Sequence, residues 1–409
     1  MTVATRIFWF LSLSALIFAA RPAVHAQQAY DGGVITTTVA NTGEKAVSIV
    51  SSNADIAGLL EVAFSAHGGF RVVKPGEGVF TFTVEPAGSN AVRLKIQSGR
   101  PLVTQLEETV RGNSLRDAAL RAGDLAVLRT TGKPGFFAGK LAFVGSEGKK
   151  QEVYTSDLFF RNVRRLTQDN SYSQHPRWSP DGRKLLYTGY YRTGFPDIFM
   201  IDLDTGRRTT VAGYKGTNTG AVFSPSGQNI AMVLSSTGSP EVYVAGADGQ
   251  RPQLVTQGTS RSVESDPDWS PDGGRLVLTS DQLGGPQLFV VSSRGGRPSR
   301  LPTNISGYCT EPAWNPSSGA NNIAFTASTR GGYQVAIYDL ATRKSQFLTS
   351  GAGSFSQPRW LNDGRHLIAM NANRGEETLW LIDSETGKKT KLPSGRLNKI
   401  SQPDFVYPQ

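Results

Sequence analysis

One short phrase that returns at a fixed spacing constrains the fold of this chain more than any other feature. It reads Pro-Asp-Trp-Ser-Pro-Asp-Gly at residues 267–273, and variants of it begin at Pro176, Ala221, Pro312, Pro358 and Pro403. The aromatic residues at its third position stand at 178, 223, 269, 314, 360 and 405, so consecutive copies are 45 or 46 residues apart. An internal repeat of this period indicates a propeller or a solenoid.

The content of each repeat favours the propeller. After the phrase comes an apolar run such as Lys184 to Thr188, then a polar loop, then a second run such as Asp197 to Leu203, and a short final strand. Four short strands every 45 residues make one propeller blade, whereas a solenoid of this period would need helices or a leucine ladder. The first unit near Phe137 lacks the phrase, and the last phrase has no strands after it. The sequence therefore predicts a mainly β, six-bladed propeller over residues 134–409, closed by the C-terminal strand.

The repeated residues themselves are best explained as scaffold. A large aromatic side chain at the same place in every blade packs between adjacent blades, and we expect this of Trp178, Trp269 and their equivalents. The Asp-Gly pairs are turn residues because glycine supplies the positive φ that a tight hairpin needs, so their carboxylates are not required as metal ligands. The repeat indicates the fold and leaves the function open.

The N-terminus has the pattern of a secretory signal. Arg6 is followed by the apolar stretch Ile7 to Ala20, and Val24-His25-Ala26 offers small residues for cleavage, so we predict a signal peptide over 1–26 and a soluble mature chain without a membrane-spanning segment. The formal charge falls from +10 to +8, because removing the signal takes away Arg6 and Arg21 and no acidic residue. The remaining basic residues are scattered, which argues against nucleic acid as a partner. The single cysteine, Cys309, excludes a disulfide framework and is expected to be a small buried or half-buried hydrophobic side chain.

Residues 27–133 carry no trace of the repeat and are predicted to form a separate small α/β domain. Asn53 can cap a helix ended by Gly68-Gly69, and Asn113 can cap a second one that is broken by Thr131-Gly132-Lys133-Pro134-Gly135. Between them a short strand at 70–73 and alternating runs at 79–84, 91–96 and 102–110 predict a sheet built from hairpins. The stretch Gln27 to Val39 is rich in Gly and Thr and is interpreted as a flexible N-terminal arm.

The chain resembles the TolB family, the periplasmic component of the Tol-Pal system of Gram-negative bacteria. The resemblance rests on the signal peptide, the α/β domain, Trp178-Ser179-Pro180-Asp181-Gly182 and, most specifically, residues 279–287, Thr-Ser-Asp-Gln-Leu-Gly-Gly-Pro-Gln. It implies a non-enzymatic periplasmic protein that holds the peptidoglycan-associated lipoprotein Pal at the channel mouth and binds TolA through the N-terminal arm. Such a protein supports outer-membrane integrity and cell division. A histidine usual at the channel mouth in the family, before the strand that contains Phe223, is replaced here by Thr217 or Asn218.

The residues just before each phrase are predicted to rim one end of the channel, where a partner would bind. They are polar and include three carboxylates and one histidine, which suits a basic or polar partner segment. The predicted mouth residues are Gln174, His175, Asn218, Thr219, Glu264, Asp266, Thr310, Glu311, Ser356 and Gln357, with Gly220, Ser401 and Gln402 completing the ring. Tyr172 and Tyr308 in the adjoining loops are candidate aromatic anchors.

Two other functions stay open on the sequence. A lactonase or quinone-dependent dehydrogenase would need channel ligands, for which Glu264, Asp266, Glu311 and His175 are available. A glycan- or solute-binding propeller would depend on rim aromatics. No Gly-x-Ser-x-Gly elbow accompanies the repeats, so a serine peptidase is not expected. We expect a monomer with no cofactor, no catalytic residue and no metal, although three carboxylates near a channel could also bind Ca²⁺.

Overall fold

The structure, a computed structural model, describes residues 43–256, 262–395, 397 and 399–408. The predicted signal peptide at 1–26 and the predicted arm at 27–39 lie outside the described residues. Within the part that is described, no helix combines the length and the apolar character that crossing a membrane requires. Cys309 is buried and unpaired, as the sequence predicts.

The N-terminal part, which we call the α/β module (residues 43–131), is one sheet with two helices. The sheet has the strand order β2-β1-β3-β4-β5. Its elements in chain order are β1 (Lys45–Val50), α1 (Ala54–Ala66), β2 (Phe70–Val72), β3 (Phe80–Pro86), β4 (Ala91–Ser98), β5 (Val103–Arg111) and α2 (Leu115–Thr131). The predicted hairpins through β3, β4 and β5 are confirmed. Strand β1 was not predicted; it pairs in parallel with both β2 and β3, which makes the sheet mixed.

The helix caps follow from short polar side chains. Asn53 caps α1 as predicted, because its Oδ1 accepts hydrogen bonds from the backbone N–H groups of Asp55 (3.0 Å) and Ile56 (3.1 Å). The predicted cap of α2 at Asn113 is wrong by one residue. Ser114 is the cap, since its Oγ accepts from the N–H of Asp117, whose carboxylate in turn accepts from the N–H of Asn113.

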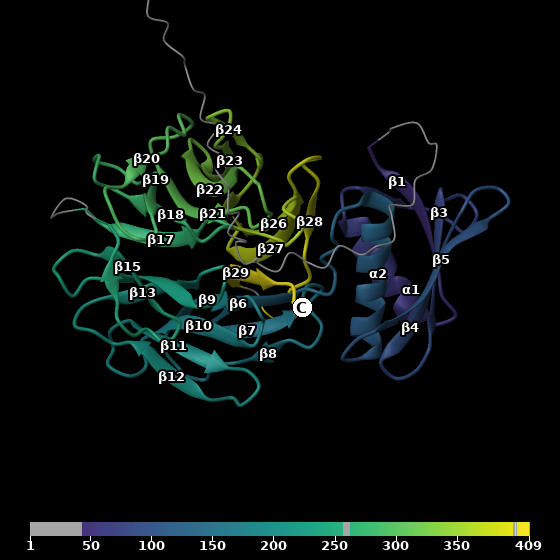
Figure 1. Cartoon of the computed structure of the whole chain (residues 1–409), viewed down its shortest axis with the longest axis horizontal. Helices are drawn as coiled ribbons and strands as arrows, with labels where there is room; N and C mark the ends of the chain where they lie inside the picture. The colour runs from purple at the N-terminus through teal and green to yellow at the C-terminus, as the bar shows by residue number, and fades with distance from the viewer. Residues whose placement is uncertain (1–42, 257–261, 396, 398, 409) are drawn as a thin grey trace, which may run out of the picture. The chain divides into compact units, whose positions relative to one another are not determined.

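Six four-stranded antiparallel sheets follow the module and form the blades of a propeller (Figure 1). The first blade in the chain combines β6 (Lys140–Glu147), β7 (Lys150–Asp157) and β8 (Arg164–Arg165) with the last strand, β29 (Ile400–Val406). The next two blades are β9 (Ser173–Trp178), β10 (Lys184–Gly189), β11 (Asp197–Asp202), β12 (Arg208–Ala212), and β13 (Asn218–Phe223), β14 (Asn229–Leu234), β15 (Glu241–Gly246), β16 (Gln253–Leu254). The last three are β17 (Glu264–Trp269), β18 (Arg275–Ser280), β19 (Gln287–Ser292), β20 (Ser299–Arg300); β21 (Cys309–Trp314), β22 (Asn322–Thr329), β23 (Gly332–Asp339), β24 (Lys344–Phe347); and β25 (Ser354–Trp360), β26 (His366–Asn373), β27 (Glu376–Asp383), β28 (Lys389–Lys391).

The ring is closed by strand exchange between the two ends of the propeller, which confirms the predicted closure. Strand β29 pairs antiparallel with β6, with Phe405 opposite Leu141 and Val406 opposite Lys140. Closure gives the blade that contains β6 its fourth strand, so each described blade has four strands and its inner strand contacts those of both neighbouring blades.

The repeated aromatic residues pack between blades as expected. Trp269 is buried in a cluster with Ala231 of the preceding blade and Leu276 of its own. The indole N–H of Trp360 donates to the backbone carbonyl of Ala313 at 3.0 Å, which ties one blade to the next. The Asp-Gly turns are also confirmed, since Gly182, Gly273 and their equivalents have φ near +67°.

One hydrophobic core runs from the α/β module into the propeller. It includes Phe64 of α1, Phe136 and Phe137 of the connection to β6, and Leu381 of β27, all of them buried. The module is thus fixed to the propeller by shared apolar burial as well as by the polar contacts described below.

Candidate functional site

Each inner strand of the propeller carries the same distortion near the start of the repeated phrase. The register against the second strand shifts by one residue in every blade, as at Ser265/Asp268 and Thr310/Ala313. The residue directly before the phrase has a left-handed backbone, with φ between +50° and +64°. These six residues, which we call the mouth ring, are His175, Gly220, Asp266, Glu311, Gln357 and Gln402. A left-handed residue other than glycine is costly, and such strain collects at functional sites.

Hydrogen bonds between blades hold part of the mouth ring in place. A side-chain oxygen of Glu311 accepts from the backbone N–H of Gln357 at 2.9 Å, and Oε1 of Gln357 accepts from the N–H of Gln402 at 2.7 Å. Gln402 continues the series across the closure of the propeller, because its Oε1 accepts from the N–H of His175 at 2.6 Å. The series stops at His175, because the N–H of the next ring residue, Gly220, donates to the hydroxyl of Thr188 (3.4 Å). The side chains of Glu311, Gln357 and Gln402 therefore link four consecutive blades at the mouth ring.

Asp266 and Glu311, from adjacent blades, give the mouth ring its charge. Burial raises the pKa of Glu311, and the nearby Asp266 carboxylate raises it further. Burial lowers the pKa of His175 to about 4, against the opposing pull of Asp266, so this imidazole is neutral at pH 7. Around neutral pH the ring is acidic, and a cationic group of a partner would relieve the repulsion between the two carboxylates.

A second set of charged residues lies two positions after the mouth ring along the inner strands, and it was not predicted from the sequence. It consists of Arg177, Asp268, Arg359 and Asp404, each standing one residue after the proline of its phrase. Asp268 accepts from the N–H of Trp314 and Asp404 from that of Trp178, both at 2.7 Å, so each carboxylate also links two blades. Burial raises the pKa of Asp268 to about 7 and that of Asp404 to about 6. The sequence signal was available, since the same repeat position holds two acidic and two basic residues.

The other predicted mouth residues take different positions. Glu264 is fully buried and accepts from the hydroxyl of Ser280 at 3.0 Å, so its carboxylate serves the blade interior. Asn218 is also buried, and its amide accepts from the N–H of Tyr214 and donates to the Tyr214 carbonyl. Gln174 donates to Gln151 (2.5 Å), Thr219 shares a hydrogen bond with Thr188 (3.2 Å), Thr310 is half-buried and Ser356 is buried. The one-residue bulge separates these side chains from the ring, and strand alternation alone does not reveal it.

Exposed aromatic and aliphatic side chains surround the mouth ring. The connections before each inner strand and between the second and third strands lie at the mouth end, since the inner strands start there. The exposed side chains at this end are 38% exposed at Tyr308 to 68% at Phe195; they include Tyr172, Tyr191, Phe195, Tyr214, Leu283 and Tyr308 in these connections and Tyr333 near the start of β23. Tyr172 packs on Tyr190 and Tyr308 on Tyr333, with ring centroids 5.9 and 5.8 Å apart. At the opposite end, the described turns carry one exposed large hydrophobic side chain, Val163 between β7 and β8.

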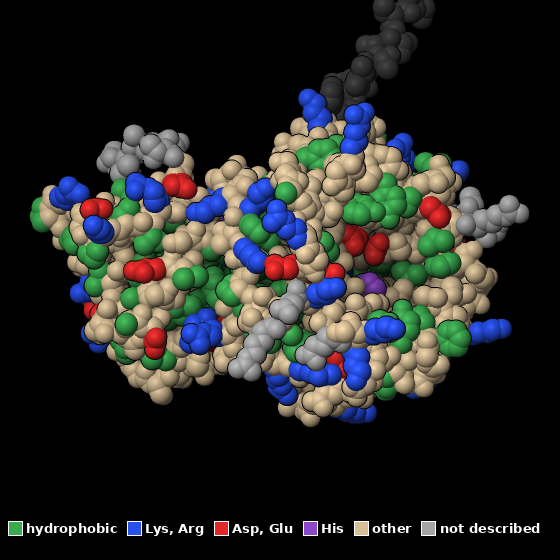
Figure 2. Space-filling view, turned by 180° about the vertical axis from the view of Figure 1, so that it is seen from behind, with side chains coloured by type: hydrophobic (Ala, Val, Ile, Leu, Met, Phe, Trp, Pro, Cys, Tyr) green, Lys and Arg blue, Asp and Glu red, His purple; other side chains and the backbone are tan. Residues whose placement is uncertain are grey.

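The surface view (Figure 2) shows acidic, histidine and hydrophobic side chains close together. Figure 2 shows a hollow in which acidic side chains and a histidine lie beside each other, with hydrophobic side chains around it. Apolar anchors around a polar centre are typical of protein–protein interfaces, in which aromatic residues contribute most of the affinity.

A second cluster of potential ligand atoms lies away from the mouth. His67 follows α1, and Asp363 and His366 come from the turn before β26 and from that strand; all three are buried, with ligand atoms within 4.8 Å of one another. The ring nitrogen Nδ1 of His67 already accepts from the N–H of Gly69 (3.0 Å), and Nδ1 of His366 lies 2.5 Å from Oδ2 of Asp363. The Arg365 guanidinium is a permanent cation next to the cluster. These occupied atoms and that charge do not suit a metal ion.

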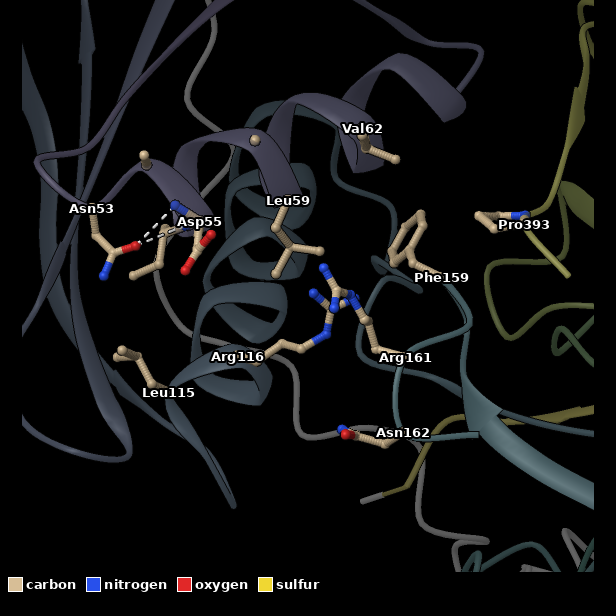
Figure 3. A pocket seen from close by; sticks show the side chains of 13 residues that line it. Asn53, Asp55, Leu59, Val62, Leu115, Arg116, Phe159, Arg161, Asn162 and Pro393 are labelled. Carbon is tan, nitrogen blue, oxygen red and sulfur yellow. Dashed lines mark hydrogen bonds between the residues drawn. The ribbon is translucent and has the colours of Figure 1, made fainter. Parts of the chain in front are cut away.

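A cavity of about 690 Å³ lies between the first half of α1 and the propeller. Figure 3 shows Leu59, Val62 and Phe159 around it, with Arg116 and Arg161 extending into it. Arg116 is held by Asp157, with Nε 2.7 Å from Oδ2. The cavity separates the N-terminal half of α1 from Phe159 and Pro393, whereas the C-terminal end of the helix closes on the propeller through His67.

The fold is a six-bladed β-propeller with an acidic ring and exposed aromatic side chains at one end. The profile of the TolB β-propeller domain family matches residues 127–405, and the chain belongs to this family. It is 35% identical over 127 residues to the Tol-Pal system protein TolB of Desulfosudis oleivorans, covering 31% of this chain and 28% of that protein. It is 30% identical over 175 residues to TolB of Anaeromyxobacter dehalogenans, covering 43% and 39%. The chain thus aligns with only about a third of the length of these relatives.

A solved structure extends the likeness to the whole architecture. The crystal structure of TolB from Acinetobacter baumannii superposes with a TM-score of 0.78 and covers 89% of this chain and 97% of that one. Its sequence identity of 21% makes this a likeness of fold.

Proposed function

We propose that this chain is a non-enzymatic periplasmic binding protein of the Tol-Pal system, in which the channel mouth binds the peptidoglycan-associated lipoprotein Pal. Membership of the TolB propeller family supports a role in the Tol-Pal system. The observation that carries the site is the acidic pair Asp266 and Glu311, which is held in a strained ring and surrounded by exposed tyrosines. A lactonase or quinone-dependent dehydrogenase would need Glu264 as a channel ligand, but this side chain is buried in its blade. In this role the protein supports outer-membrane integrity and cell division.

A charge-reversal experiment tests the mouth. The double variant Asp266→Lys with Glu311→Lys places two cations where the partner would bring one, so we expect at least a tenfold loss of lipoprotein retention in a pull-down from periplasmic extract. The matched control is Asp204→Lys with Asp248→Lys, which makes the same charge change on turns at the opposite end of the propeller. Circular dichroism establishes that both variants fold. If the unaltered protein retains no such lipoprotein, or if both double variants retain it equally, the mouth assignment is wrong.

The second partner in the proposal is TolA, bound through the N-terminal arm at 27–39. This part of the proposal is supported by the family resemblance and by the position of the segment before the module. Deleting 27–39 is expected to remove TolA binding in a pull-down and to leave lipoprotein retention within twofold of the unaltered chain. Loss of both partners together would contradict the assignment of two separate sites.

A further inference from the structure

The α/β module meets the propeller at a buried pair of histidine rings. His67 is the C-cap of α1, and its ring centroid lies 4.5 Å from that of His366 on β26, with 67° between the planes. Phe136 of the connection stacks on His67 at 5.4 Å and also contacts His366 at 4.5 Å. His67 is 4% exposed and His366 is fully buried. The backbone closes tightly around the pair, because a Cβ on Gly68 would stand 1.8 Å from Oδ2 of Asp383.

The hydrogen bonds assign a neutral state to His67. Its Nδ1 accepts from the N–H of Gly69, which requires a lone pair there and therefore places the single proton on Nε2. His366 is oriented differently, because the Asp363 carboxylate can only accept and so Nδ1 of His366 must donate to it. The Nε2 atom of His366 faces Oδ2 of Asp383 at 3.7 Å. A proton added to His67 would remove the acceptor of the Gly69 N–H.

Charged groups face His67 from the propeller side. Asp363 and Arg365 belong to the turn before β26, and Asp383 ends β27. Arg365 is shared between Asp383 (Nη2 to Oδ2, 2.5 Å) and Glu385 (Nη1 to Oε2, 2.8 Å), so much of that negative charge is already compensated. The ring neighbours from the module and the connection, Phe70, Phe136 and Phe137, carry no charge. A cationic His67 would meet Arg365 and His366 in a site with little water.

We propose that the His67–His366 contact is an acid-sensitive closure, which holds the α/β module on the propeller while His67 is neutral and loosens when His67 takes up a proton. The closure depends only on the module–propeller contact and is independent of what the mouth binds. It gives the chain a way to change the docking of its two parts with the acidity of its surroundings.

The direction of the effect follows from linkage. Burial, helped by His366 and Arg365, lowers the pKa of His67 from 6.5 to about 3 in the docked state. A group with a depressed docked pKa contributes stability above its free pKa and loses it as the pH falls between 6.5 and 3. Between pH 7.5 and pH 5 the docking equilibrium should therefore weaken by about 30-fold through His67 alone.

Asp124 titrates at the same contact with the opposite sign. This buried carboxylate of α2 accepts from the N–H groups of Phe137 (2.6 Å) and Ala138 (2.9 Å) and from the hydroxyl of Tyr407 (2.9 Å). Burial raises its pKa to about 7, so acid favours its docked form. Any test must therefore isolate His67 from Asp124.

The variant His67→Asn separates the effect of His67 from that of Asp124. The Asn oxygen can replace Nδ1 as acceptor for the N–H of Gly69 but cannot take up a proton. Hydrogen exchange of full-length chains is measured at pH 7.5 and 5.0 on peptides covering 361–370, which lie at the contact and omit position 67. The ratio of protection between the unaltered chain and His67→Asn should fall about 30-fold between the two pH values. Peptides covering 322–339 in another blade should show a constant ratio.

A ratio at 361–370 that does not change with pH overturns the proposal. If His67→Asn does not fold, the histidine Cε1–H signals of the unaltered chain decide. His67 should keep its neutral chemical shift in the docked form at pH 5. A His67 signal that titrates near pH 6.5 while 361–370 stay protected would equally overturn it.

Discussion

Ending the chain after Lys399, which removes β29, is expected to abolish the single cooperative unfolding transition of the propeller. The strand supplies the inner edge of the blade that contains β6, and without it that edge is open. The same strand carries Gln402 and Asp404, whose side chains accept the N–H groups of His175 and Trp178 in the next blade. The loss should match the whole stability of a domain, roughly 5–15 kcal/mol, because the ring cannot close.

Thermal unfolding followed by circular dichroism checks this expectation. The control ends after Tyr407, so that it keeps β29 and the hydrogen bond from Tyr407 to Asp124. A peptide of residues 400–409 added to the shorter chain should restore part of the transition, since it can pair with β6. A chain without β29 that still unfolds cooperatively within about 2 kcal/mol of the control would show that closure does not hold the propeller together.

The blades were predictable because the inner strand and the turn after it repeat with similar residues in each blade. Each copy combines an aromatic residue that needs a neighbouring blade with a glycine that needs a positive φ, and both demands are visible locally. Strand β1 was not predictable in the same way. Its six residues pair in parallel with β2 and β3, so its partners lie beyond α1 and no hairpin turn marks them.

The sequence located the mouth but not the orientation of its side chains. The residue directly before each phrase lies in the mouth ring, as at Asp266 and Glu311, whereas Glu264, two residues away from Asp266, is buried. Strand alternation places Asp266 and Glu264 on the same face of the strand, and only their contacts in the folded blade tell them apart. His67 and His366 lie far apart in the chain, on a module and a blade with unrelated patterns, so their contact could come only from the tertiary structure.

Replacing Gly68 with Ala is expected to cost about 3 kcal/mol of unfolding free energy, even though only one methyl group is added. The new Cβ would lie 1.8 Å from Oδ2 of Asp383 and 2.7 Å from Oγ1 of Thr386, and Asp383 is nearly fully buried. Asp383 cannot move aside freely, because Arg365 binds both of its oxygens and the N–H of Glu385 donates to Oδ1 at 2.9 Å. Displacing it would disturb a buried ion pair, which is far more costly than repacking a surface side chain.

The matched control is Gly58→Ala, which adds the same methyl group in the interior of α1, where nothing lies within 4 Å of the new Cβ. That substitution should stabilise the protein by about 0.5–1 kcal/mol, since alanine restricts the unfolded chain and favours the helix. Urea unfolding of both variants measures the difference. A Gly68→Ala chain within about 1 kcal/mol of the unaltered protein would mean that the contact between Gly68 and Asp383 is looser than the structure shows, and the closure around His67 with it.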